Sequence, residues 1–278
     1  MQHNYNCWLL SIVVCTTFTN TTYNNVEKLI KHYAKNPIKV FMNSSTVSNL
    51  GFGNCDSSQN GENLVIETFI RKNDIVLDVG AHIGLWSKAV LKATNNSCSI
   101  YSFEPVPDSY DVLKKLESPL VNRVFTFCCA LGKEEKQTTM NYFFVRGSDC
   151  STLFERPILS DVPVCKIIVD VTYLDKFSEE NNIQHINFLK IDTEGAELNV
   201  IHGARKLLEN NKIDIIQFEY GGTYPDANIT LKEVYNYLLS HNYTLFRIVS
   251  NGLIHIAEWV ESLENFQYSN YLALKNIA

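Results

Sequence analysis

Short, mostly apolar runs recur along the chain from residue 62 onward and alternate with a second pattern. In the first pattern, β-branched and aromatic residues follow one another with few polar interruptions, as in strands that are buried on both faces of a parallel sheet. In the second, apolar residues recur every three or four positions, which is typical of a helix with one buried face. The strands are predicted at 75–79, 99–103, 121–130, 186–191 and 213–218, and the helices at 63–71, from 85 onward, at 106–116, from 173 and at 196–208.

The C-terminal third adds a helix and three further strands. Thr230 and Glu233 form a capping box for a helix that runs to about residue 239. Strands follow at 243–248, 253–256 and 268–274, and two others, at 138–145 and 164–171, flank a polar loop at 146–152. The alternation predicts an α/β fold with a doubly wound, mostly parallel sheet and an antiparallel C-terminal edge strand.

Residues 1–60 show this alternation of strands and helices less clearly. A helix at 26–34, a short strand at 38–42 and a loop at 43–60 are the expected elements. We therefore divide the chain into an N-terminal extension, 1–60, whose position suggests a cap over the site, and one domain at 61–278. With 278 residues and 45% hydrophobic content, the chain is long enough for one large α/β domain.

Charge and cysteine usage narrow the class of protein. The formal charge of −6 argues against a nucleic-acid binder, whose usual footprint is a basic face. No apolar segment reaches the ~18 residues of a membrane span. Trp8 to Val14 has no Lys or Arg before it, so a packed strand or helix is favoured over a signal peptide.

The eight cysteines include no C-x-x-C pair, so the spacing of a zinc site is absent. Cys98, Cys128 and Cys165 stand in strand-like runs, where we expect small buried core residues. A reducing compartment, and hence a cytoplasmic location, is the simplest interpretation.

The stretch from Ile75 to Ser87 reads I-V-L-D-V-G-A-H-I-G-L-W-S and predicts a strand, a glycine turn and a helix. In open α/β sheets, nucleotide-like ligands bind at such a turn. The turn, Asp78 through Gly84, has His82 where the dinucleotide fingerprint places its second glycine, which argues against a pyrophosphate ligand. S-adenosylmethionine, a nucleoside without phosphates, fits this turn better, with Gly80 allowing close approach of the backbone.

Carboxylates stand at the ends of four predicted strands: Asp78, Glu104, Asp192 and Glu219. The carboxyl ends of neighbouring parallel strands meet at the edge where ligands bind. Glu104 follows Asp78 by 26 residues, close to the ~20-residue spacing of a ribose-binding acid; a helix-capping role is the alternative. Glu194 and Glu197 also suit the first turn of a helix, where negative charge is favourable.

These motifs together resemble the FkbM family of S-adenosylmethionine-dependent methyltransferases. The resemblance runs from about residue 62 to 275 and rests on V-L-D-V-G-A-H-I-G, F-E-P-V-P, A-L-G, K-I-D-T-E-G-A-E-L-N-V-I-H-G-A, F-E-Y and N-Y-L-A-L-K. It implies a class I (Rossmann-like) methyltransferase fold with a seven-stranded sheet. It also implies O-methylation of a hydroxyl on a sugar or another small-molecule or glycan acceptor.

The resemblance also assigns roles to individual residues. It implies that the methionine part of the cofactor is bound by Asp78, Gly80 and Gly84, the ribose by Glu104, and the adenine by the 128–132 turn with Cys129 and Ala130. Asp192 lies beside the cofactor in this assignment. His82 stands where the family usually has Asn, and both side chains can donate a hydrogen bond. The 146–151 loop is similar to a loop that approaches the acceptor.

For the chemistry, Asp192 and Glu219 are the candidates for the general base or for a clamp on the acceptor, with Glu194 and His82 behind them. A divalent cation shared by Asp192 and Glu219 is an alternative, because carboxylate oxygens suit Mg²⁺. Two other functions stay open: a nicotinamide-dependent oxidoreductase, which the missing G-x-G-x-x-G disfavours, and an inactive protein with this fold. Methylation of nucleic acid is disfavoured by the acidic charge.

Overall fold

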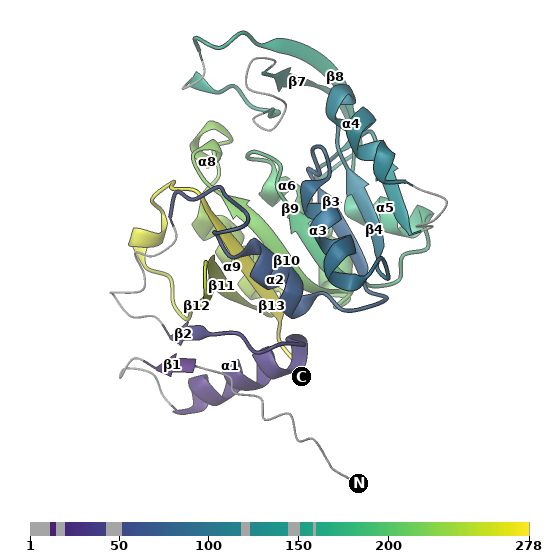
Figure 1. Ribbon diagram of the computed structural model, residues 1–278. Coiled ribbons are helices and arrows are strands. Elements are labelled where there is room, and N and C mark those ends of the chain that lie inside the picture. Colours follow the sequence, from purple (N-terminus) through teal and green to yellow (C-terminus); the bar gives the residue numbers. More distant parts are fainter. Residues whose placement is uncertain are drawn as a thin grey trace.

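The computed structural model describes residues 12–14, 20–42, 52–117, 123–143, 151–157 and 160–277. A ten-stranded sheet crosses the molecule in the order β1-β2-β12-β11-β13-β10-β9-β3-β4-β5, with helices on both faces (Figure 1). A three-stranded sheet, β6-β8-β7, lies apart from it at one end. The α/β architecture predicted from the sequence is confirmed.

Nearly all predicted strands are found within a few residues of their expected limits. The large sheet contains β1 (Ile12–Val14), β2 (Val40–Met42), β3 (Ile75–Val79), β4 (Ser99–Phe103), β5 (Val124–Phe127), β9 (Ile186–Ile191), β10 (Ile213–Tyr220), β11 (Tyr243–Val249), β12 (Gly252–Ile256) and β13 (Ser269–Lys275). The small sheet contains β6 (Ala130–Leu131), β7 (Lys136–Tyr142) and β8 (Cys165–Thr172).

The sheet differs from the expectation in two respects. It has ten strands in place of seven, because β12, β2 and β1 continue it beyond β11. The antiparallel strand β13 is also not at the edge: it pairs on one side with β10 and on the other with β11. All seven residues of β13 are buried, so its apolar pattern marked a buried strand but did not reveal how many neighbours it has.

The helices also follow the predicted order. They are α1 (Asn20–Tyr33), α2 (Glu62–Phe69), α3 (Leu85–Thr94), α4 (Pro107–Leu113) with a 3-10 turn at Lys114–Leu116, α5 (Leu174–Glu180), α6 (Glu197–His202), α7 (Arg205–Glu209), α8 (Thr223–Asp226) and α9 (Leu231–Ser240). The single helix expected at 196–208 is divided between α6 and α7, and α8 was not predicted. The capping box of Thr230 and Glu233 is formed.

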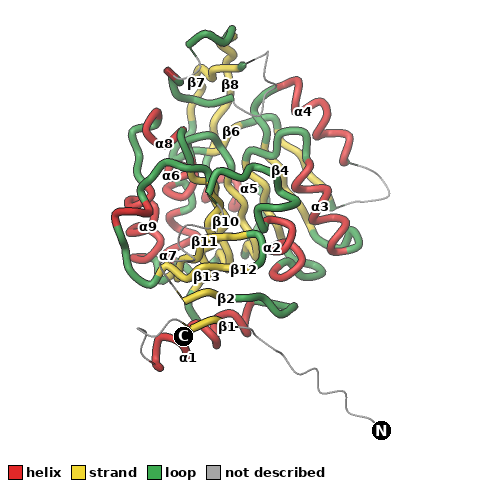
Figure 2. The backbone as a smooth tube through the Cα atoms, turned by 60° about the vertical axis from the view of Figure 1, so that its left-hand side comes forward, coloured by secondary structure: helices red, strands yellow, loops and turns green. Residues whose placement is uncertain are grey.

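The N-terminal segment joins the far edge of the sheet, away from the small sheet (Figures 1 and 2). Strand β2 pairs in parallel with β12, and β1 pairs in parallel with β2. Val26, Leu29 and Ile30 of α1 are buried in a hydrophobic cluster shared with the large sheet. Of the loop expected at 43–60, residues 43–51 lie outside the described part of the chain, as do residues 8–11 of the apolar N-terminal run.

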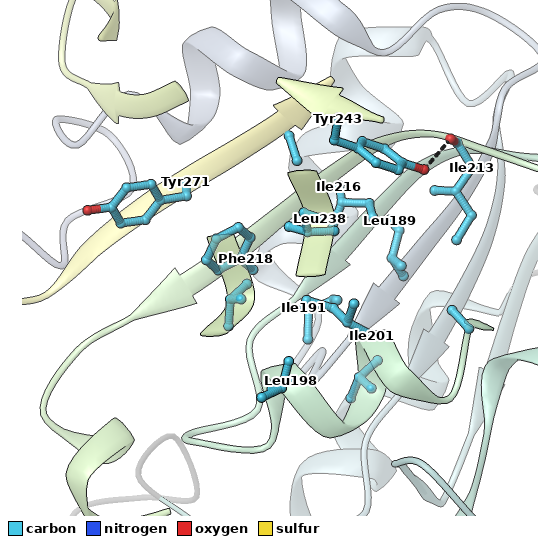
Figure 3. Close-up of a cluster of buried hydrophobic side chains, with 14 of the residues drawn as sticks. Leu189, Ile191, Leu198, Ile201, Ile213, Ile216, Phe218, Leu238, Tyr243 and Tyr271 are labelled. Carbon is cyan, nitrogen blue, oxygen red and sulfur yellow. Dashed lines mark hydrogen bonds between the residues drawn. The ribbon is translucent and has the colours of Figure 1, made fainter. Parts of the chain in front are cut away.

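The core consists of apolar side chains on the two faces of the sheet, and β9 shows how the sequence supplies both. Leu189 and Ile191 belong to one hydrophobic cluster, whereas Phe188 belongs to the cluster on the other face. Figure 3 shows the first of these, where Leu189 and Ile191 lie near Ile216 and Phe218 of β10. The alternation follows from the two-residue repeat of a strand. The parallel pairing of β9 with β10 places their carboxyl ends side by side.

The cysteine expectation is correct for one residue and wrong for two. Cys98 is buried, but Cys128 and Cys165 are exposed. Cys128 follows β5, the last strand of the large sheet, and Cys165 begins β8, whose residues are largely exposed. An apolar run at the margin of a sheet is thus covered less completely than the same run at its centre. Among the described helices, none is long and apolar enough to cross a bilayer.

Candidate functional site

Two adjoining cavities lie at the carboxyl ends of the central strands. The first, of about 150 Å³, extends from Gly80 and Glu104 to apolar side chains of the small-sheet region, including Met140 and Leu153. The second, of about 520 Å³, lies on the other side of the β3–α3 turn and is lined by α2, α3 and the end of β10. Both cavities share four lining residues: Gly80, His82, Asp192 and Glu194.

Gly80 makes close contact between the ends of β3 and β9 possible. A Cβ atom at this position would stand 1.7 Å from the carbonyl oxygen of Asp192. The backbone of Gly80 also has a positive φ of 78°, a conformation that glycine adopts without steric cost. The turn therefore needs glycine for two independent reasons, and both place the backbone of Gly80 at the junction of the two cavities.

Glu104, which follows the neighbouring strand β4, binds the backbone of the β3–α3 turn. Its Oε2 accepts a hydrogen bond from the His82 backbone N–H, and its Oε1 accepts one from the Val106 N–H, both at 2.8 Å. The side chain is buried, and burial raises the pKa of Glu104 to about 7 even though the two N–H groups act in the opposite direction. A carboxylate that lines a cavity at this depth is stabilised by further hydrogen-bond donors, such as the hydroxyls of a ligand.

His82 lies in the left-handed region with a φ of 48°. Outside glycine, Asn, Asp and His adopt this conformation most readily. This explains physically why His82 can stand where Asn is usual in the related turn: both satisfy the same backbone requirement. The backbone N–H of His82 is used by Glu104, while the residue lines both cavities.

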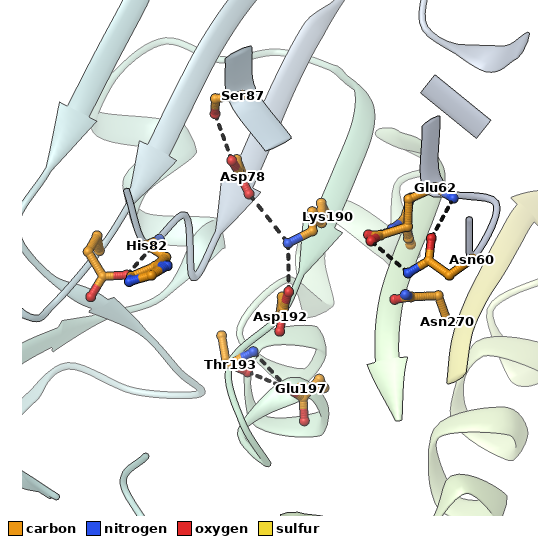
Figure 4. Close-up of polar contacts among 12 residues, drawn as sticks. Asn60, Glu62, Asp78, His82, Ser87, Lys190, Asp192, Thr193, Glu197 and Asn270 are labelled. Carbon is orange, nitrogen blue, oxygen red and sulfur yellow. Dashed lines mark hydrogen bonds and ion pairs between the residues drawn. The ribbon is translucent and has the colours of Figure 1, made fainter. Parts of the chain in front are cut away.

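A buried ion-pair chain joins β3 to β9 (Figure 4). The Nζ atom of Lys190 lies 2.8 Å from Oδ2 of Asp192 and 3.8 Å from Oδ1 of Asp78. The other oxygen of Asp78 accepts a hydrogen bond of 2.6 Å from Ser87. Burial raises the pKa of Asp78, and the Lys190 ammonium opposes this rise. Asp78 is fully buried and is not among the residues that line the two cavities, so it supports the site from beneath.

Glu219, at the end of β10, faces Asp192 in the second cavity. The pKa of Glu219 is raised well above its usual range by burial, by the carboxylates of Asp192, Glu194 and Glu197, and by a hydrogen bond to Asp192. Like charges so near to Glu219 disfavour its ionised form. The sequence-based expectation that β9 and β10 bring these acids together is confirmed.

Glu194 is held in place by Arg156 and Thr152. Arg156 Nη1 lies 3.2 Å from its Oε2, and the same guanidinium also lies near Asp226 of α8. The carbonyl oxygen of Glu194 accepts a hydrogen bond of 2.6 Å from the Thr152 hydroxyl. Arg156 thereby ties the 151–157 segment to the rim of the second cavity.

Glu197 has a structural role. Its carboxylate accepts hydrogen bonds from the backbone N–H and the hydroxyl of Thr193 (Figure 4). It also accepts one from the backbone N–H of Gly195. Burial raises the pKa of Glu197 to about 7, against these hydrogen bonds. It shapes the β9–α6 turn that presents Asp192 and Glu194, as the alternative interpretation of this acid predicted.

The remaining predicted residues divide into two groups. Cys129 and Ala130 line the first cavity, together with Phe103 and Leu131. Gly84 is not among the lining residues; a Cβ there would meet Leu113 and Leu116 within 2.8 Å, so this glycine serves the packing of α3 against α4. Of the 146–151 loop, only Ser151 is described, and it lines the first cavity.

Sequence reasoning missed several residues of the site. Lys190 left a signal, because a lysine inside an otherwise apolar, centrally placed strand needs buried partners. Glu62, Arg156 and Tyr268, which line the second cavity, left none, because they come from segments whose packing no local pattern determines. Trp86 packs against Phe188, and the ammonium near its ring belongs to Lys190, at 5.8 Å from the ring centroid.

No group of three or more His, Cys, Asp or Glu side chains suited to a metal ion is found within the described ranges. The two carboxyl groups of Asp192 and Glu219 stand beside the Lys190 ammonium.

Comparison with known proteins assigns the family. Residues 78–245, more than half of the chain, match the family model described as the methyltransferase FkbM domain. The chain therefore belongs to the FkbM methyltransferase family, and its fold is the class I, Rossmann-like methyltransferase fold.

Among curated proteins, the chain is similar to Methyltransferase 1 of Beauveria bassiana (strain ARSEF 2860), with 27% identity over 147 residues that cover 47% of this chain and 58% of that protein. Methyltransferase sdnD of Sordaria araneosa is 28% identical over 158 residues, which cover 47% of this chain and 60% of that protein. The chain thus spans less than two thirds of the length of either relative. Among solved structures, methyltransferase FkbM from Methylobacillus flagellatus KT is 17% identical, with a TM-score of 0.47 and coverage of 73% of this chain and 44% of that one.

Proposed function

We propose that the chain is an S-adenosylmethionine-dependent methyltransferase that methylates a hydroxyl of a small-molecule or glycan acceptor. The observation that carries this proposal is the pair of adjoining cavities at the carboxyl ends of β3, β4, β9 and β10, which meet at Gly80 and Asp192. Methyl transfer joins two ligands, and its reacting atoms must meet at one point. The site has a place for each ligand and a common boundary between them.

The residues of the first cavity suit the proposed cofactor. Glu104 offers carboxylate oxygens to the two hydroxyls of a ribose, and its raised pKa indicates that it lacks sufficient donors by itself. Cys129, Ala130 and Leu131 supply an apolar wall for an adenine ring. Gly80 lines this cavity at the turn before α3, which supports contact with the amino-acid end. Asp78 and Gly84 are proposed to support this end through the turn rather than by contact.

When bound, this cofactor supplies an electrophilic methyl group on a sulfonium. The residues of the chain then have to orient the acceptor oxygen, exclude water and take up the hydroxyl proton. We assign these tasks to Asp192 and Glu219, which line the second cavity, and Glu194 lies at the shared boundary. Orientation of this kind supplies up to about 7–11 kcal/mol in the best-aligned systems.

The lining of the second cavity supports a hydroxylated acceptor. Its charged groups are mainly carboxyls, from Glu62, Asp192, Glu194 and Glu219, and carboxylates accept hydrogen bonds from hydroxyls. Its cations are already used, since Lys190 and Arg156 form ion pairs with carboxylates. A phosphate backbone would meet these acids, so we do not propose nucleic acid as the acceptor.

The segment before α2 belongs to the same proposal. Cys55 and Ser57 line the second cavity beside the N-terminus of α2. We propose that this end of the 1–60 extension is the cap that was expected from its position, acting as a wall of the acceptor cavity.

The test is transfer of a labelled methyl group from S-adenosylmethionine to a panel of sugars, polyols and glycans. The expected product is a methyl ether that carries the label, formed by the unaltered protein. Asp192→Asn should reduce the rate by roughly 10²–10⁴-fold, because it removes the proposed base without changing the size of the side chain. Asp161→Asn, at an exposed position outside the site, is the matched control and should be active. Labelling at nitrogen or carbon only would contradict the proposed acceptor class.

A further inference from the structure

Tyr268 lines the second cavity from a position just before β13. Its phenol oxygen accepts a hydrogen bond of 3.0 Å from Nδ2 of Asn270, a residue that is 5% exposed. Its backbone carbonyl accepts one of 2.8 Å from the N–H of Gly53. Both the side chain and the backbone of Tyr268 are therefore held in place, and neither contact uses the phenol O–H.

The hydrogen bond from Asn270 determines how the phenol can act on a ligand. The oxygen accepts the Asn270 N–H through a lone pair, so its own hydrogen points away from Asn270. Among the residues that the structure describes, none accepts this O–H. The phenol of Tyr268 is thus a hydrogen-bond donor that the protein itself leaves available in the second cavity.

The charges of the cavity keep this donor intact. Burial raises the pKa of Tyr268, and the nearby carboxylates of Glu219 and Glu62 add to the rise. The phenol therefore keeps its hydrogen at every physiological pH. A carboxylate can only accept a hydrogen bond, whereas this phenol donates one, so the cavity offers both kinds of partner to a ligand.

Asn270 also connects the phenol with the acid at the end of β10. It stands directly opposite Glu219 in the antiparallel pairing of β10 with β13, and side chains paired in this way lie on one face of the sheet. One side chain thus separates the phenol oxygen of Tyr268 from Glu219. A small ligand that meets both groups carries two oxygens close to each other.

Gly221 leaves space beside Tyr268 in the same cavity. Its φ is not in the left-handed region, and the nearest atom to a Cβ at this position would be the Cα of Tyr268, at 3.6 Å. Neither the backbone conformation nor the packing therefore requires glycine here. What the missing side chain provides is room for a ligand next to the phenol.

We propose that Tyr268 is a specificity-determining residue, which donates a hydrogen bond to a second oxygen of the acceptor, on the carbon next to the one that carries the reacting hydroxyl. Asn270 is the positioning residue that directs this donor. The preferred acceptor is then a molecule with oxygens on neighbouring carbons, as in a sugar, rather than an isolated alcohol. This assignment rests on the proposed function, because it takes the second cavity as the acceptor site.

The test compares tetrahydropyran-3-ol with cyclohexanol as probes of the free, full-length protein. The two probes differ at one ring position, where an ether oxygen, which only accepts hydrogen bonds, replaces a CH₂ group. Affinities are measured by NMR from the amide resonances of Gly221 and Gly222, which line the cavity. Tetrahydropyran-3-ol should bind about three- to tenfold more tightly than cyclohexanol, as one neutral hydrogen bond provides.

A second signal locates the contact. Tyrosine labelled with ¹³C at Cζ reports on hydrogen bonds of the phenol, and the Tyr268 resonance is identified by its loss in Tyr268→Phe. Tetrahydropyran-3-ol should move this resonance. In Asn270→Leu the resonance should shift before any probe is added, and the preference for the ether should be smaller, because the O–H is no longer held in one direction.

In Tyr268→Phe the two affinities should become equal. Tyr23→Phe, on α1 at the far edge of the sheet, is the matched control and should keep the preference. Equal affinities in the unaltered protein, no response to either probe, or a preference that persists in Tyr268→Phe would overturn the proposal. The titration involves neither cofactor nor transfer, so a protein that prefers the ether but methylates no hydroxyl would contradict the proposed function alone.

Discussion

Glu104 is a buried carboxyl group whose ionised form is disfavoured in the protein without a ligand. It lies 5% exposed between two backbone N–H groups, and its pKa rises from 4.5 to about 7 because burial disfavours the charge. Such groups are common at functional sites, where the missing stabilisation comes from a ligand.

The raised pKa of Glu104 predicts a pH dependence with a definite sign. The folded protein binds this proton more tightly than the unfolded chain, so the Glu104 contribution to stability is fully present below pH 4.5 and is lost as the pH rises through about 7. The loss corresponds to about 3 kcal/mol of unfolding free energy. Urea denaturation of the free protein at pH 5 and pH 8 measures it.

Glu104→Gln should remove this part of the difference between pH 5 and pH 8, because the amide stays neutral throughout. Glu67→Gln, at an exposed position of α2, is the control and should retain it. A Glu104→Gln variant with the full pH dependence of the unaltered protein would show that Glu104 is not the group responsible.

At the scale of elements, the site depends on the close approach of the β3 turn to the end of β9. The Asp192 N–H donates a hydrogen bond of 2.9 Å to the carbonyl of Val79, and Gly80 leaves space for the Asp192 carbonyl. These backbone contacts hold the shared boundary of the two cavities.

Gly80→Ala should therefore lower the unfolding free energy by more than about 3 kcal/mol, since the methyl group meets backbone that cannot yield and φ stays positive. Gly53 offers a matched control: its φ is 79°, but a Cβ there meets nothing within 4 Å. Gly53→Ala isolates the cost of the conformation, about 1 kcal/mol. Equal losses in the two variants, measured by denaturant unfolding, would exclude the steric contribution.

The sequence predicted those elements whose pattern is local. The strand 75–79 and the strand 99–103 have the predicted limits, because a buried central strand shows a continuous apolar run bounded by turn residues. The break between α6 and α7 and the internal position of β13 were not predictable, because they depend on packing between distant segments. In the small sheet, the expected burial of Cys165 was wrong, because the strand β8 that it begins is largely exposed.

The same distinction, between residues that a local pattern marks and residues that long-range packing brings in, applies to the site. Glu104, Asp192 and Glu219 were found because each ends a strand, and parallel strands bring their ends together. Arg156 and Glu62 reach the same cavity from a loop and from a helix N-terminus, where no spacing rule places them. Asp78 was expected at the cofactor, but its buried side chain contacts Ser87 of α3 and Lys190 and does not line either cavity.

At the scale of the whole molecule, the proposed function requires that the cavity between the large and small sheets binds the cofactor. Calorimetric titration with S-adenosylhomocysteine tests this requirement without knowledge of the acceptor. We predict one binding event per chain, and about 10–100-fold weaker binding by Glu104→Gln at pH 8, because a charge-assisted hydrogen bond to the ribose is worth about 1.5–3 kcal/mol. Glu67→Gln should bind like the unaltered protein. No heat of binding, or equal affinity in Glu104→Gln and the unaltered protein, would contradict the proposed cofactor site.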